Sequence, residues 1–465
     1  MNEAQAYDQL IDLIVRTDII DLPENTYTTV DRAMIDTLGV TIAGTQEPSA
    51  RILAGYVSGS GKANGARVIG AGYYANAESA ALVNGTALHA LDFDDTGAYS
   101  QGHPSAPIFP AILALSEEMG CSMDRFASAY VVGVEVLSRL SRSMPMMHLK
   151  GWHPTAVIGA IAATAACCNL LRLGHNEVRN ALGLAATQAG GLVRSFGSMA
   201  KPLHVGQAAS LGVRSTLLAE AGMTGNQGIL FGEHGFLANF HGDVGERAKE
   251  QLKQSGTPWA MINPGINIKR YPCCSLTHRS IDALLLILEE SGLTYDQVAR
   301  VECRVPPRAI KVLFHVRPTD GLQAKFSMQF ALACALIHGA VELVHFSSSY
   351  ILAPTIRSLM ERIDVAVHDD WKDGDDSRAD VVTIYLHSGQ VLRKEVSVPL
   401  GNVSRPLSAE AIQAKFRSCV APVLGRGTAE KCLAWFDSPF NSRDLRNIMD
   451  LVSLPPSGLA PSETR

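Results

Sequence analysis

The sequence predicts a mainly α protein with an α+β part, as a large all-helical domain plus a smaller α+β domain. Three observations support this fold class. Apolar residues recur at the spacing of an α-helix through most of residues 1–265. An alternation of apolar and polar residues, which is typical of strands, then appears at residues 298–305 and 380–398. Helical spacing returns from residue 408 to residue 452.

The helical part contains eight segments in which apolar residues fall at positions i, i+3 and i+4. Alanine and glycine are frequent within these segments, so neighbouring helices can approach each other closely. Together they predict a helical bundle in which most small residues serve packing. The segments are 27–43, 78–91, 106–119, 123–143, 154–171, 176–186, 204–221 and one that starts at 249.

The α+β part combines one strand, two helices and a hairpin. Residues 298–305 (VARVECRV) alternate apolar and charged side chains, which indicates a strand. Residues 380–398 form two alternating runs around Ser388-Gly389, a pattern typical of a β-hairpin. Helical patterns at 280–291 and 329–339 lie between these strands. Strands and helices in this order predict one small α+β domain.

We therefore divide the chain into two domains. The helical domain is predicted to consist of residues 1–266 and 401–460, and the α+β domain of residues 267–400. The helical domain is discontinuous because the helical pattern after the hairpin is expected to rejoin the first bundle. Two domains are also what a chain of 465 residues leads one to expect.

Charge and hydropathy exclude several classes of protein. The net charge is −5 and no stripe of Lys and Arg is present, so we expect no nucleic-acid partner. The longest apolar run, residues 155–168, has about 14 residues, which is short for a membrane span and right for a buried core helix. The N-terminus carries acids where a signal peptide needs bases. We expect no membrane association.

The nine cysteines indicate neither a structural metal site nor a disulfide framework. Cys167-Cys168 and Cys273-Cys274 are adjacent pairs, and no C-x-x-C motif occurs. A structural zinc or an iron–sulfur cluster is therefore not expected. Many unpaired thiols suit a reducing compartment, which predicts a cytoplasmic protein.

The stretch from Asn84 to Pro110 is the strongest candidate for a functional site. It places a polar loop between two apolar helices, where carboxylates must be solvated, paired or functional. The alternative is that the aspartates only cap helices and that the histidine is structural. The polar residues are Asp92, Asp94, Asp95, Thr96, Tyr99, Ser100, Gln101 and His103.

Two further loops bring candidate residues to helix N-termini. His153 precedes Pro154 at the start of an alanine-rich helix, where it could bind a carboxylate or transfer a proton, or could be an ordinary loop histidine. Lys201 is flanked by Met, Ala, Pro and Leu, with His204 nearby. Such a lysine could bind an anion, although a surface lysine near the helix start fits the sequence equally well.

The junction of the two predicted domains carries the remaining candidates, because ligand clefts often form at such boundaries. Lys269 and Arg270 are adjacent cations that could bind carboxylates. Cys273 and Cys274 follow them, and packing is the favoured role for these thiols. Farther along, Lys325 is predicted to lie on the surface.

Together these residues favour proton-transfer chemistry on a small polycarboxylate. They supply several cations and one carboxylate, and no glycine-rich nucleotide-binding loop is present. A metal-dependent enzyme that binds Mg²⁺ through Asp92, Asp94 and Asp95 is an alternative. A protein that binds polycarboxylates without turnover is another.

Five motifs in this order resemble the MmgE/PrpD family, which includes 2-methylcitrate dehydratase, cis-aconitate decarboxylase and iminodisuccinate epimerase. The resemblance extends from about Thr28 to Leu451. It implies a helical domain, a smaller lid domain, an active site between them, and a homodimer without metal or organic cofactor. The motifs are NGTALHALDFDDT with HPSAPIFPAILAL, GWHPTAVIGAIAA, GSMAKPLHVGQAA, KRYPCCSLTH and AKFSMQFALA.

The resemblance also implies roles for individual residues. The pocket groups of the family correspond to Asp92, Thr96, His103, His153, Lys201 and Lys269. On this basis we expect His103 or His153, oriented by Asp92, to remove a proton next to a carboxylate. The expected catalytic residues are Asp92, His103, His153 and Lys201, and the expected substrate-binding residues are Thr96, Lys269, Arg270, Cys274 and His278.

One departure bears on the choice of reaction within the family. In the decarboxylase branch a histidine follows the lid lysine by a few residues, whereas Cys273 and Cys274 follow Pro272 here and His278 comes later. This difference disfavours decarboxylation. We expect a cofactor-independent lyase that dehydrates a 2-methylcitrate-like hydroxy acid, with a cis-aconitate-type decarboxylase or an iminodisuccinate-type epimerase as alternatives.

Overall fold

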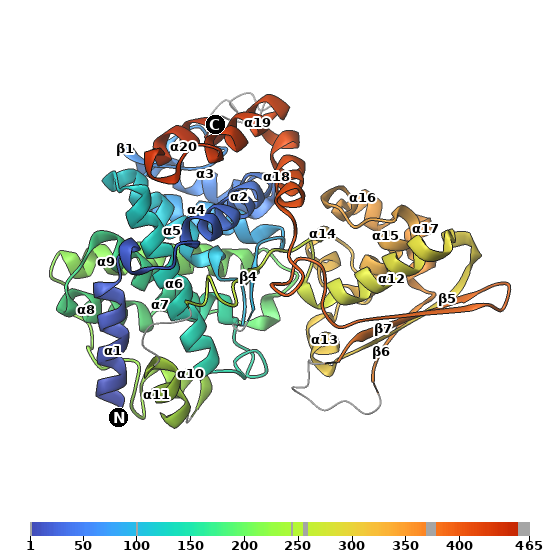
Figure 1. Ribbon diagram of the computed structural model, residues 1–465, viewed down its shortest axis with the longest axis horizontal. Coiled ribbons are helices and arrows are strands. Elements are labelled where there is room, and N and C mark those ends of the chain that lie inside the picture. The colour runs from blue at the N-terminus through green and yellow to red at the C-terminus, as the bar shows by residue number, and fades with distance from the viewer. Residues whose placement is uncertain (1, 99–100, 243–244, 254–258, 369–377, 454–465) are drawn as a thin grey trace.

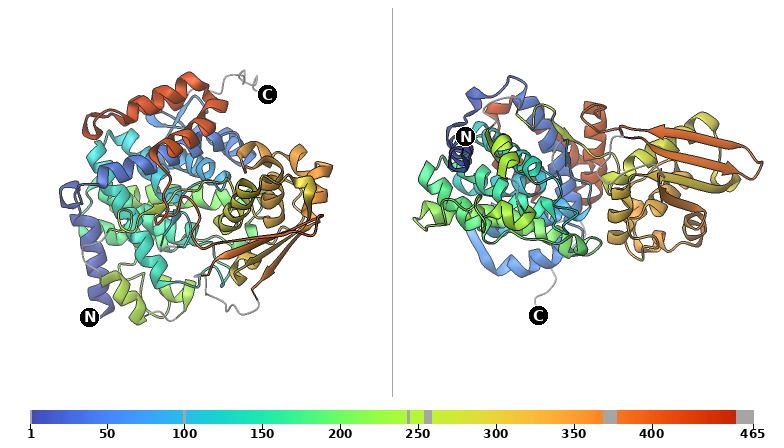
Figure 2. Two further views of the ribbon diagram at one scale, coloured as in Figure 1. Left: turned by 45° about the vertical axis from the view of Figure 1, so that its right-hand side comes forward. Right: turned by 90° about the horizontal axis from the view of Figure 1, so that it is seen from below.

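The computed structural model describes residues 2–98, 101–242, 245–253, 259–368 and 378–453. Figure 1 shows two lobes, a large one built from helices and a smaller one that carries a sheet. Figure 2 shows from two further directions that the smaller lobe lies at one side of the larger. The predicted fold class, mainly α with an α+β part, is confirmed. We call the two parts the helical lobe and the lid.

The helical lobe contains the segments predicted from helical spacing. Most boundaries agree with the prediction to within one residue, and the largest differences are at α9 and α11, which each begin four residues earlier than expected. The helices are α1 (Glu3–Arg16), α2 (Thr26–Gly44), α3 (Pro48–Val57), α4 (Ala77–Ala90), α5 (Ser105–Met119), α6 (Met123–Ser143), α7 (Pro154–Leu171), α8 (His175–Ala186), α9 (Ala200–Glu220), α10 (Phe236–His241) and α11 (Gly245–Lys253).

The apolar run at 155–168 forms the centre of this lobe, as the sequence predicted. It belongs to α7, which packs against α5, α6 and α9. Among the described residues α7 is the one helix long and apolar enough to cross a membrane, and 94% of that window is buried inside the protein. The core helix of a globular protein is buried to the same extent.

Close packing of α4 against α9 sets the position of the site. A Cβ atom on Gly206 of α9 would lie 2.2 Å from Thr86 Oγ1 and 2.3 Å from the carbonyl oxygen of Leu82. Only glycine permits this approach of the two helices. This contact brings the end of α4 close to the start of α9. The Asp92 loop follows α4, and Lys201 lies at the start of α9.

Three helices after the lid return to the helical lobe: α18 (Ala409–Leu424), α19 (Arg426–Phe436) and α20 (Leu445–Val452). Helix α18 packs on α2, and Phe416 and Val420 join the core of the helical lobe. Residues 454–460 of the predicted helical domain lie outside the described residues.

The lid is a mixed four-stranded sheet covered by helices, in the strand order β6-β5-β7-β8. Its strands β5 (Val298–Val305), β7 (Asp380–Leu386) and β8 (Val391–Val396) match the predicted strand and hairpin. The other strand, β6 (Ile363–Val367), pairs in parallel with β5. The helices are α12 (His278–Ser291), α13 (Pro307–Val312), α14 (Gly321–Ala324), α15 (Met328–His338), α16 (Ser348–Ile351) and α17 (Pro354–Met360).

The expectation that residues 1–265 are almost entirely helical misses two short antiparallel pairs. Strand β1 (Gly61–Arg67) pairs with β2 (Tyr74–Ala75), although its sequence, GKANGAR, has no β-branched or aromatic residue. Strand β3 (Thr96–Gly97) pairs with β4 (Ile266–Asn267). Both pairs are held by tertiary contacts rather than by local preference.

Two chain segments that run side by side connect the lobes. The amide of Ile268 donates a hydrogen bond of 3.0 Å to the carbonyl oxygen of Gly401. The amide of Val403 donates one of 2.9 Å to Asn267 Oδ1. The β3–β4 pair fastens the first segment to the loop that follows α4. The lid is therefore attached at the place where the candidate site lies.

Candidate active site

A cavity of about 400 Å³ lies between the lobes and is lined by both of them. The helical lobe contributes the loops after α4 and before α7 and α9. The lid contributes the segment before α12 and the start of α13, and the two connections complete the wall. Of the predicted site residues, those that line it are Asp92, Thr96, His103, His153, Lys201, Lys269, Cys274 and His278.

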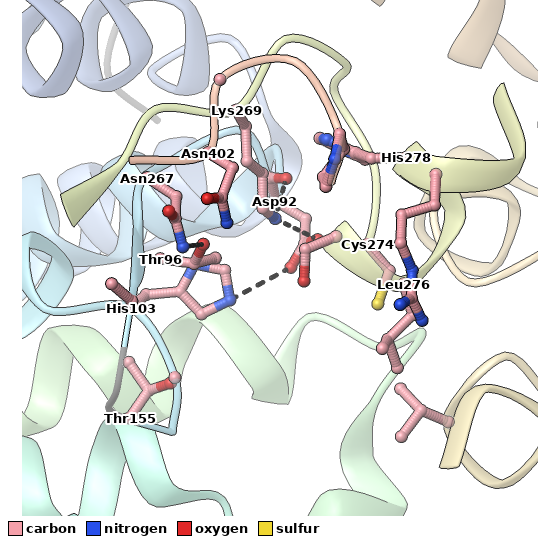
Figure 3. Close-up of a pocket in the computed structure, with 18 of the residues that line it drawn as sticks. Asp92, Thr96, His103, Thr155, Asn267, Lys269, Cys274, Leu276, His278 and Asn402 are labelled. Carbon is pink, nitrogen blue, oxygen red and sulfur yellow. Dashed lines mark hydrogen bonds and ion pairs between the residues drawn. The ribbon is translucent and has the colours of Figure 1, made fainter. Parts of the chain in front are cut away.

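Asp92 is the centre of the charge arrangement. Its carboxylate forms ion pairs with Lys201 through Oδ1 and with Lys269 through Oδ2, the latter at 2.8 Å. Lys269 Nζ also donates a hydrogen bond of 2.6 Å to the carbonyl oxygen of Asp92. All three side chains are buried, and Figure 3 shows Lys269 directed at Asp92.

The ion pairs fix the protonation of this group. Burial alone would raise the pKa of Asp92, but Lys201 and Lys269 outweigh it and hold the pKa well below its ordinary value. Burial would likewise lower the pKa of Lys269, and Asp92 reverses this so that the pKa is raised. The cluster therefore consists of one carboxylate and two cations at neutral pH, with a net positive charge.

His103 is held by Asp94, which corrects the expectation that Asp92 orients it. His103 Nδ1 lies 3.0 Å from Asp94 Oδ2, and its Nε2 lies 3.9 Å from Asp92 Oδ1. The contact at Nδ1 lacks hydrogen-bond geometry, but a carboxylate at this distance favours the proton on that nitrogen through its charge, which leaves Nε2 as the basic nitrogen. His89 Nδ1 contacts the same Asp94 oxygen at 2.7 Å. Asp94 thus serves two histidines, and its pKa is held well below the ordinary value because both outweigh its burial.

His153 lies at the N-terminus of α7 as a buried, neutral group. Its amide donates a hydrogen bond of 2.9 Å to the carbonyl oxygen of Gly191, and its ring packs on Phe196 at 5.0 Å. Burial lowers the pKa of His153 well below its ordinary value, and the neighbouring His89 and Lys201 act in the same direction. A neutral imidazole can exchange hydrogen bonds with a ligand but does not attract a carboxylate as a cation would.

Thr96 and Asn267 join the helical lobe to the lid beside the carboxylate. The two residues face each other in the β3–β4 pair, and Asn267 Nδ2 donates a hydrogen bond of 3.3 Å to Thr96 Oγ1. Figure 3 shows this contact above His103, with Asn402 of the second connection nearby. Asn267 and Asn402 were missed as site residues because amides in connecting segments carry no distinctive sequence pattern.

The lid wall presents a thiol, a buried histidine and two arginines. Burial raises the pKa of Cys274, so its side chain is a protonated thiol at neutral pH. Burial lowers the pKa of His278 to about 3, and its Nε2 lies 3.3 Å from the carbonyl oxygen of Cys273. Arg279 and Arg308 also line the cavity, and Arg279 forms an ion pair of 2.9 Å with Asp380.

Comparison with known proteins assigns the chain to a family. The model of the MmgE/PrpD N-terminal domain matches residues 8–247, and that of the MmgE/PrpD C-terminal domain matches residues 271–435. The chain belongs to the MmgE/PrpD family. This membership confirms the resemblance inferred from the five motifs.

Its relatives within the MmgE/PrpD family carry two different activities. Cis-aconitate decarboxylase of Homo sapiens is 28% identical over 370 residues, which cover 76% of this chain and 75% of the relative. Cis-aconitate decarboxylase of Aspergillus terreus is 28% identical over 381 residues, covering 77% of each. 2-Methylcitrate dehydratase of Cupriavidus necator is 25% identical over 428 residues, covering 85% of this chain and 86% of the relative.

Arg270 does not line the cavity of this MmgE/PrpD chain, although it was expected among the substrate-binding residues. Its side chain is exposed, and its guanidinium lies 5.6 Å from the ring centre of Tyr271 on the wall of a second cavity. Neighbouring side chains of an extended segment point in opposite directions, so Lys269 faces Asp92 and Arg270 faces away. The predicted surface position of Lys325 is also wrong, since its side chain is buried.

The three aspartates of the loop have separate partners instead of converging on one ion. Asp92 pairs with lysines, Asp94 with histidines, and Asp95 accepts hydrogen bonds from the amide and hydroxyl of Ser105. Among the described residues, His89, Asp94 and His103 offer ligand atoms within 4.8 Å of one another. The contacts of both histidines with Asp94 account for the closeness of these three side chains. Tyr99 and Ser100 of the predicted polar run lie outside the described residues.

Two histidines and one phenylalanine at the site escaped the sequence analysis. His148 and Phe196 line the cavity, and His89 lies behind His103 with ring centres 4.7 Å apart. The signal for His89 was present, since it belongs to the apolar helix α4 and a buried histidine needs a partner. His148 sits in a loop without any comparable pattern.

Proposed function

We propose that the chain is a cofactor-independent lyase that dehydrates a di- or tricarboxylic hydroxy acid of the 2-methylcitrate type. The observation that carries the proposal is the opposition, in one cavity, of the Asp94–His103 pair and the Lys201–Asp92–Lys269 cluster. The Asp94–His103 pair supplies a base, and the Lys201–Asp92–Lys269 cluster supplies positive charge. Removal of a proton next to a carboxylate requires both.

In the proposed reaction His103 Nε2 takes the proton from the carbon next to a substrate carboxylate. Negative charge then develops on that carboxylate, where Lys201 and Lys269 stabilise it. The electron pair of the broken C–H bond forms the double bond, and the hydroxyl on the adjacent carbon leaves. This hydroxyl takes up a proton from a neutral donor and departs as water. His153 on the helical lobe and the Cys274 thiol on the lid wall are two neutral donors that line the cavity.

Decarboxylation of an unsaturated tricarboxylic acid is a second candidate, favoured by the similarity to cis-aconitate decarboxylases. There the C–C bond to one carboxylate breaks, carbon dioxide leaves, and the remaining carbanion must be protonated. The same cations would stabilise the developing charge. The protonated Cys274 thiol would be the donor on the lid wall, where the decarboxylase branch carries a histidine.

The two candidates differ in the mass of their products. Chelator-treated protein is incubated with 2-methylcitrate, citrate, cis-aconitate and iminodisuccinate, and products are followed by mass spectrometry and chiral chromatography. Loss of water from a hydroxy acid supports the proposal, and loss of carbon dioxide from cis-aconitate supports the second candidate. A new stereoisomer of unchanged mass supports an epimerase and contradicts both.

Replacing the base tests the residue assignment independently of the substrate. We expect His103→Ala to lower turnover about 10²- to 10⁴-fold, the usual contribution of a general base. The matched control is His175→Ala, because this exposed histidine pairs with Asp12 on the surface of the helical lobe. Full turnover in His103→Ala would contradict the assignment.

A further inference from the structure

A second cavity of about 940 Å³ lies between α18 and the lid and shares no lining residue with the substrate cavity. Figure 1 shows α18 facing α14 and α16 across the two lobes. Its walls are largely apolar and come from α18, the loop after α4, and the lid segment after α15. The apolar lining residues include Leu91, Phe93, Leu285, Val341, Leu343, Phe346, Leu407 and Val423.

Lys325 is the buried charge at this cavity. Its side chain is 3% exposed, and its Nζ donates one hydrogen bond of 3.3 Å to the carbonyl oxygen of Pro272. The ammonium also lies 4.4 Å from the ring centre of Phe346. No described carboxylate forms an ion pair with it. An ammonium buried with so few partners is costly, and an anion in the cavity would remove much of that cost.

Arg270 adds a second cation on the same wall. Lys325 contacts the carbonyl oxygen of Pro272, which lies two positions after Arg270 in the chain. Arg270, Tyr271 and Pro272 all line the cavity. The other charged groups around the cavity are Lys415, which pairs with Asp36 at 2.6 Å, and the carboxylates of Glu47 and Glu342. Glu47 is the carboxylate that acts most strongly on Lys325, but it forms no ion pair with it, so Lys325 and Arg270 are the cations that a ligand can still use.

We propose that this second cavity binds an amphipathic monocarboxylate, with the carboxylate on Lys325 and Arg270 and the hydrocarbon chain along the apolar walls. Cavities of this size hold drug-sized ligands, and a few convergent polar groups in an apolar cavity fix a ligand's orientation. A compact polycarboxylate would leave most of the apolar wall uncovered. The site thus differs in ligand chemistry from the substrate cavity, and it does not depend on the reaction proposed above.

Binding of decanoate to the full-length protein tests this inference without any measurement of turnover. Isothermal titration calorimetry below the micellar concentration is expected to show one decanoate per chain. Decan-1-ol, which has the same chain without the charge, is expected to bind at least tenfold more weakly. Saturating citrate is expected to leave decanoate binding unchanged, because it would occupy the other cavity.

Three variants locate the binding site. Arg270→Gln and Lys325→Met are each expected to weaken decanoate binding at least tenfold, whereas Lys431→Met, on the exposed face of α19, leaves it unchanged. If Lys325→Met fails to fold, Ser418→Trp replaces it as a test. Ser418 is exposed and lines the cavity, so a tryptophan there is expected to obstruct the cavity and abolish binding.

The inference is overturned by any of four results. The first is that decanoate does not bind, and the second is that decanoate and decan-1-ol bind with equal affinity. The third is that citrate displaces decanoate. The fourth is that Arg270→Gln and Lys431→Met bind decanoate with equal affinity. The third result would place decanoate in the substrate cavity. The fourth would show that the carboxylate does not lie beside Arg270.

Discussion

Asp92 adopts a backbone conformation that few residues other than glycine accept, with a φ of 51° directly after α4. Aspartate and asparagine tolerate this left-handed region better than other side chains do. The conformation ends the helix and directs the carboxylate to Lys201, while the carbonyl oxygen of Asp92 accepts a hydrogen bond from Lys269. The same residue therefore shapes the loop and places the two cations.

Asp94→Asn tests whether the carboxylate fixes the state of His103. An amide can donate a hydrogen bond to Nδ1, which would move the imidazole proton to Nε2 and remove the base. We expect turnover to fall at least about 10²-fold with the fold retained, a typical share of general-base catalysis. Steady-state kinetics measure the fall in turnover, and circular dichroism checks that the fold is retained.

Asp95→Asn is the matched control for that substitution. Asp95 is the next residue, but its partner is Ser105 and not a histidine. Turnover near pH 6 should therefore change little. An equal loss of turnover in Asp94→Asn and Asp95→Asn would mean that the loop tolerates no amide, and that His103 is not specifically dependent on Asp94.

The stability of the protein should depend on pH through Asp95. Burial raises the pKa of Asp95 from 3.8 to about 7, even though Ser105 stabilises the charged form. Since the folded pKa is the higher one, the folded state gains stability from this proton below pH 3.8 and loses it as the pH rises through about 7. Above pH 7 Asp95→Asn should be the more stable protein, by roughly a few kcal/mol.

Urea denaturation between pH 4 and pH 8 measures this effect. The difference in free energy of unfolding between Asp95→Asn and the wild type should increase with pH in favour of the variant. A difference that stays constant over this range would show that Asp95 is ionised throughout.

Among the elements, α4 and α9 approach each other closely at Gly206. Gly206→Ala would force the helices apart against Thr86 and the backbone of Leu82. We expect a loss of about 1–3 kcal/mol or more in stability, as for overpacked cores, together with reduced turnover because Lys201 moves away from Asp92. Chemical denaturation and kinetics measure the two effects.

Gly427→Ala is the control for this substitution. Gly427 lies in α19, and a Cβ atom there would meet no neighbour within 4 Å. The change should stabilise the protein by about 0.5–1 kcal/mol, since alanine loses less entropy than glycine in a helix. Equal effects of the two alanine variants would contradict the role given to the α4–α9 contact.

Helix α18 supports the catalytic loop through Lys415. This buried lysine forms an ion pair of 2.6 Å with Asp36 of α2 and donates a hydrogen bond of 2.9 Å to the carbonyl oxygen of Phe93. Phe93 stands between Asp92 and Asp94. Lys415→Met leaves a buried carboxylate unpaired, so we expect a loss of about 3–5 kcal/mol in stability.

The double variant Asp36→Leu/Lys415→Met separates charge from packing. Replacing both members of a buried ion pair is often nearly neutral, so most of the stability should return. Turnover should be reduced in Lys415→Met and should stay reduced in the double variant, because both lack the hydrogen bond to Phe93. Full recovery of turnover would show that Lys415 does not position the loop.

Sequence patterns predicted the elements well wherever the pattern was long. The helices of the helical lobe and the strands β5, β7 and β8 have regular spacing over many residues, and their burial follows that spacing. Strand β1 could not be predicted, because its sequence has no preference for a strand. The two-residue strands β3 and β4 are too short to show a period and exist through their pairing with each other.

The candidate site was predictable in several of its members but not in its pairings. The motifs named Asp92, His103, Lys201 and Lys269, and the cavity contains all four. The pairing of His103 with Asp94 depends on the backbone turn at Asp92, which no spacing rule gives. Of the arginines of the lid, Arg279 follows the last residue of the motif KRYPCCSLTH without belonging to it, and Arg308 comes from a segment that carries no motif. Their approach to the cavity depends on how the lid packs.

At the scale of the whole molecule the substrate cavity is shared between two lobes. A ligand that contacts Lys201 from the helical lobe and Lys269 from the connection should bind the folded protein only. Citrate is therefore expected to raise the melting temperature, with a stabilisation of about 2.7 kcal/mol at 100 times its dissociation constant. Differential scanning calorimetry measures the shift.

Two lysine variants show whether that stabilisation comes from the substrate cavity. Lys201→Met should abolish most of it, because the cation that faces the ligand is lost. Lys62→Met should leave it unchanged, since Lys62 is half-exposed and pairs with Glu118 elsewhere on the helical lobe. A citrate effect of the same size in both variants would mean that citrate binds at another place.

The return of α18 to the helical lobe affects how the protein is made. The face of α2 that α18 covers is synthesised several hundred residues before the helix that covers it. At about 5–20 residues per second the interval lasts on the order of tens of seconds. During that time α2 lacks the cover of α18, and the carboxylate of Asp36 lacks its partner Lys415. Chaperone contact on the ribosome should therefore concentrate on this face of α2, and the site should form only after α18 has been synthesised.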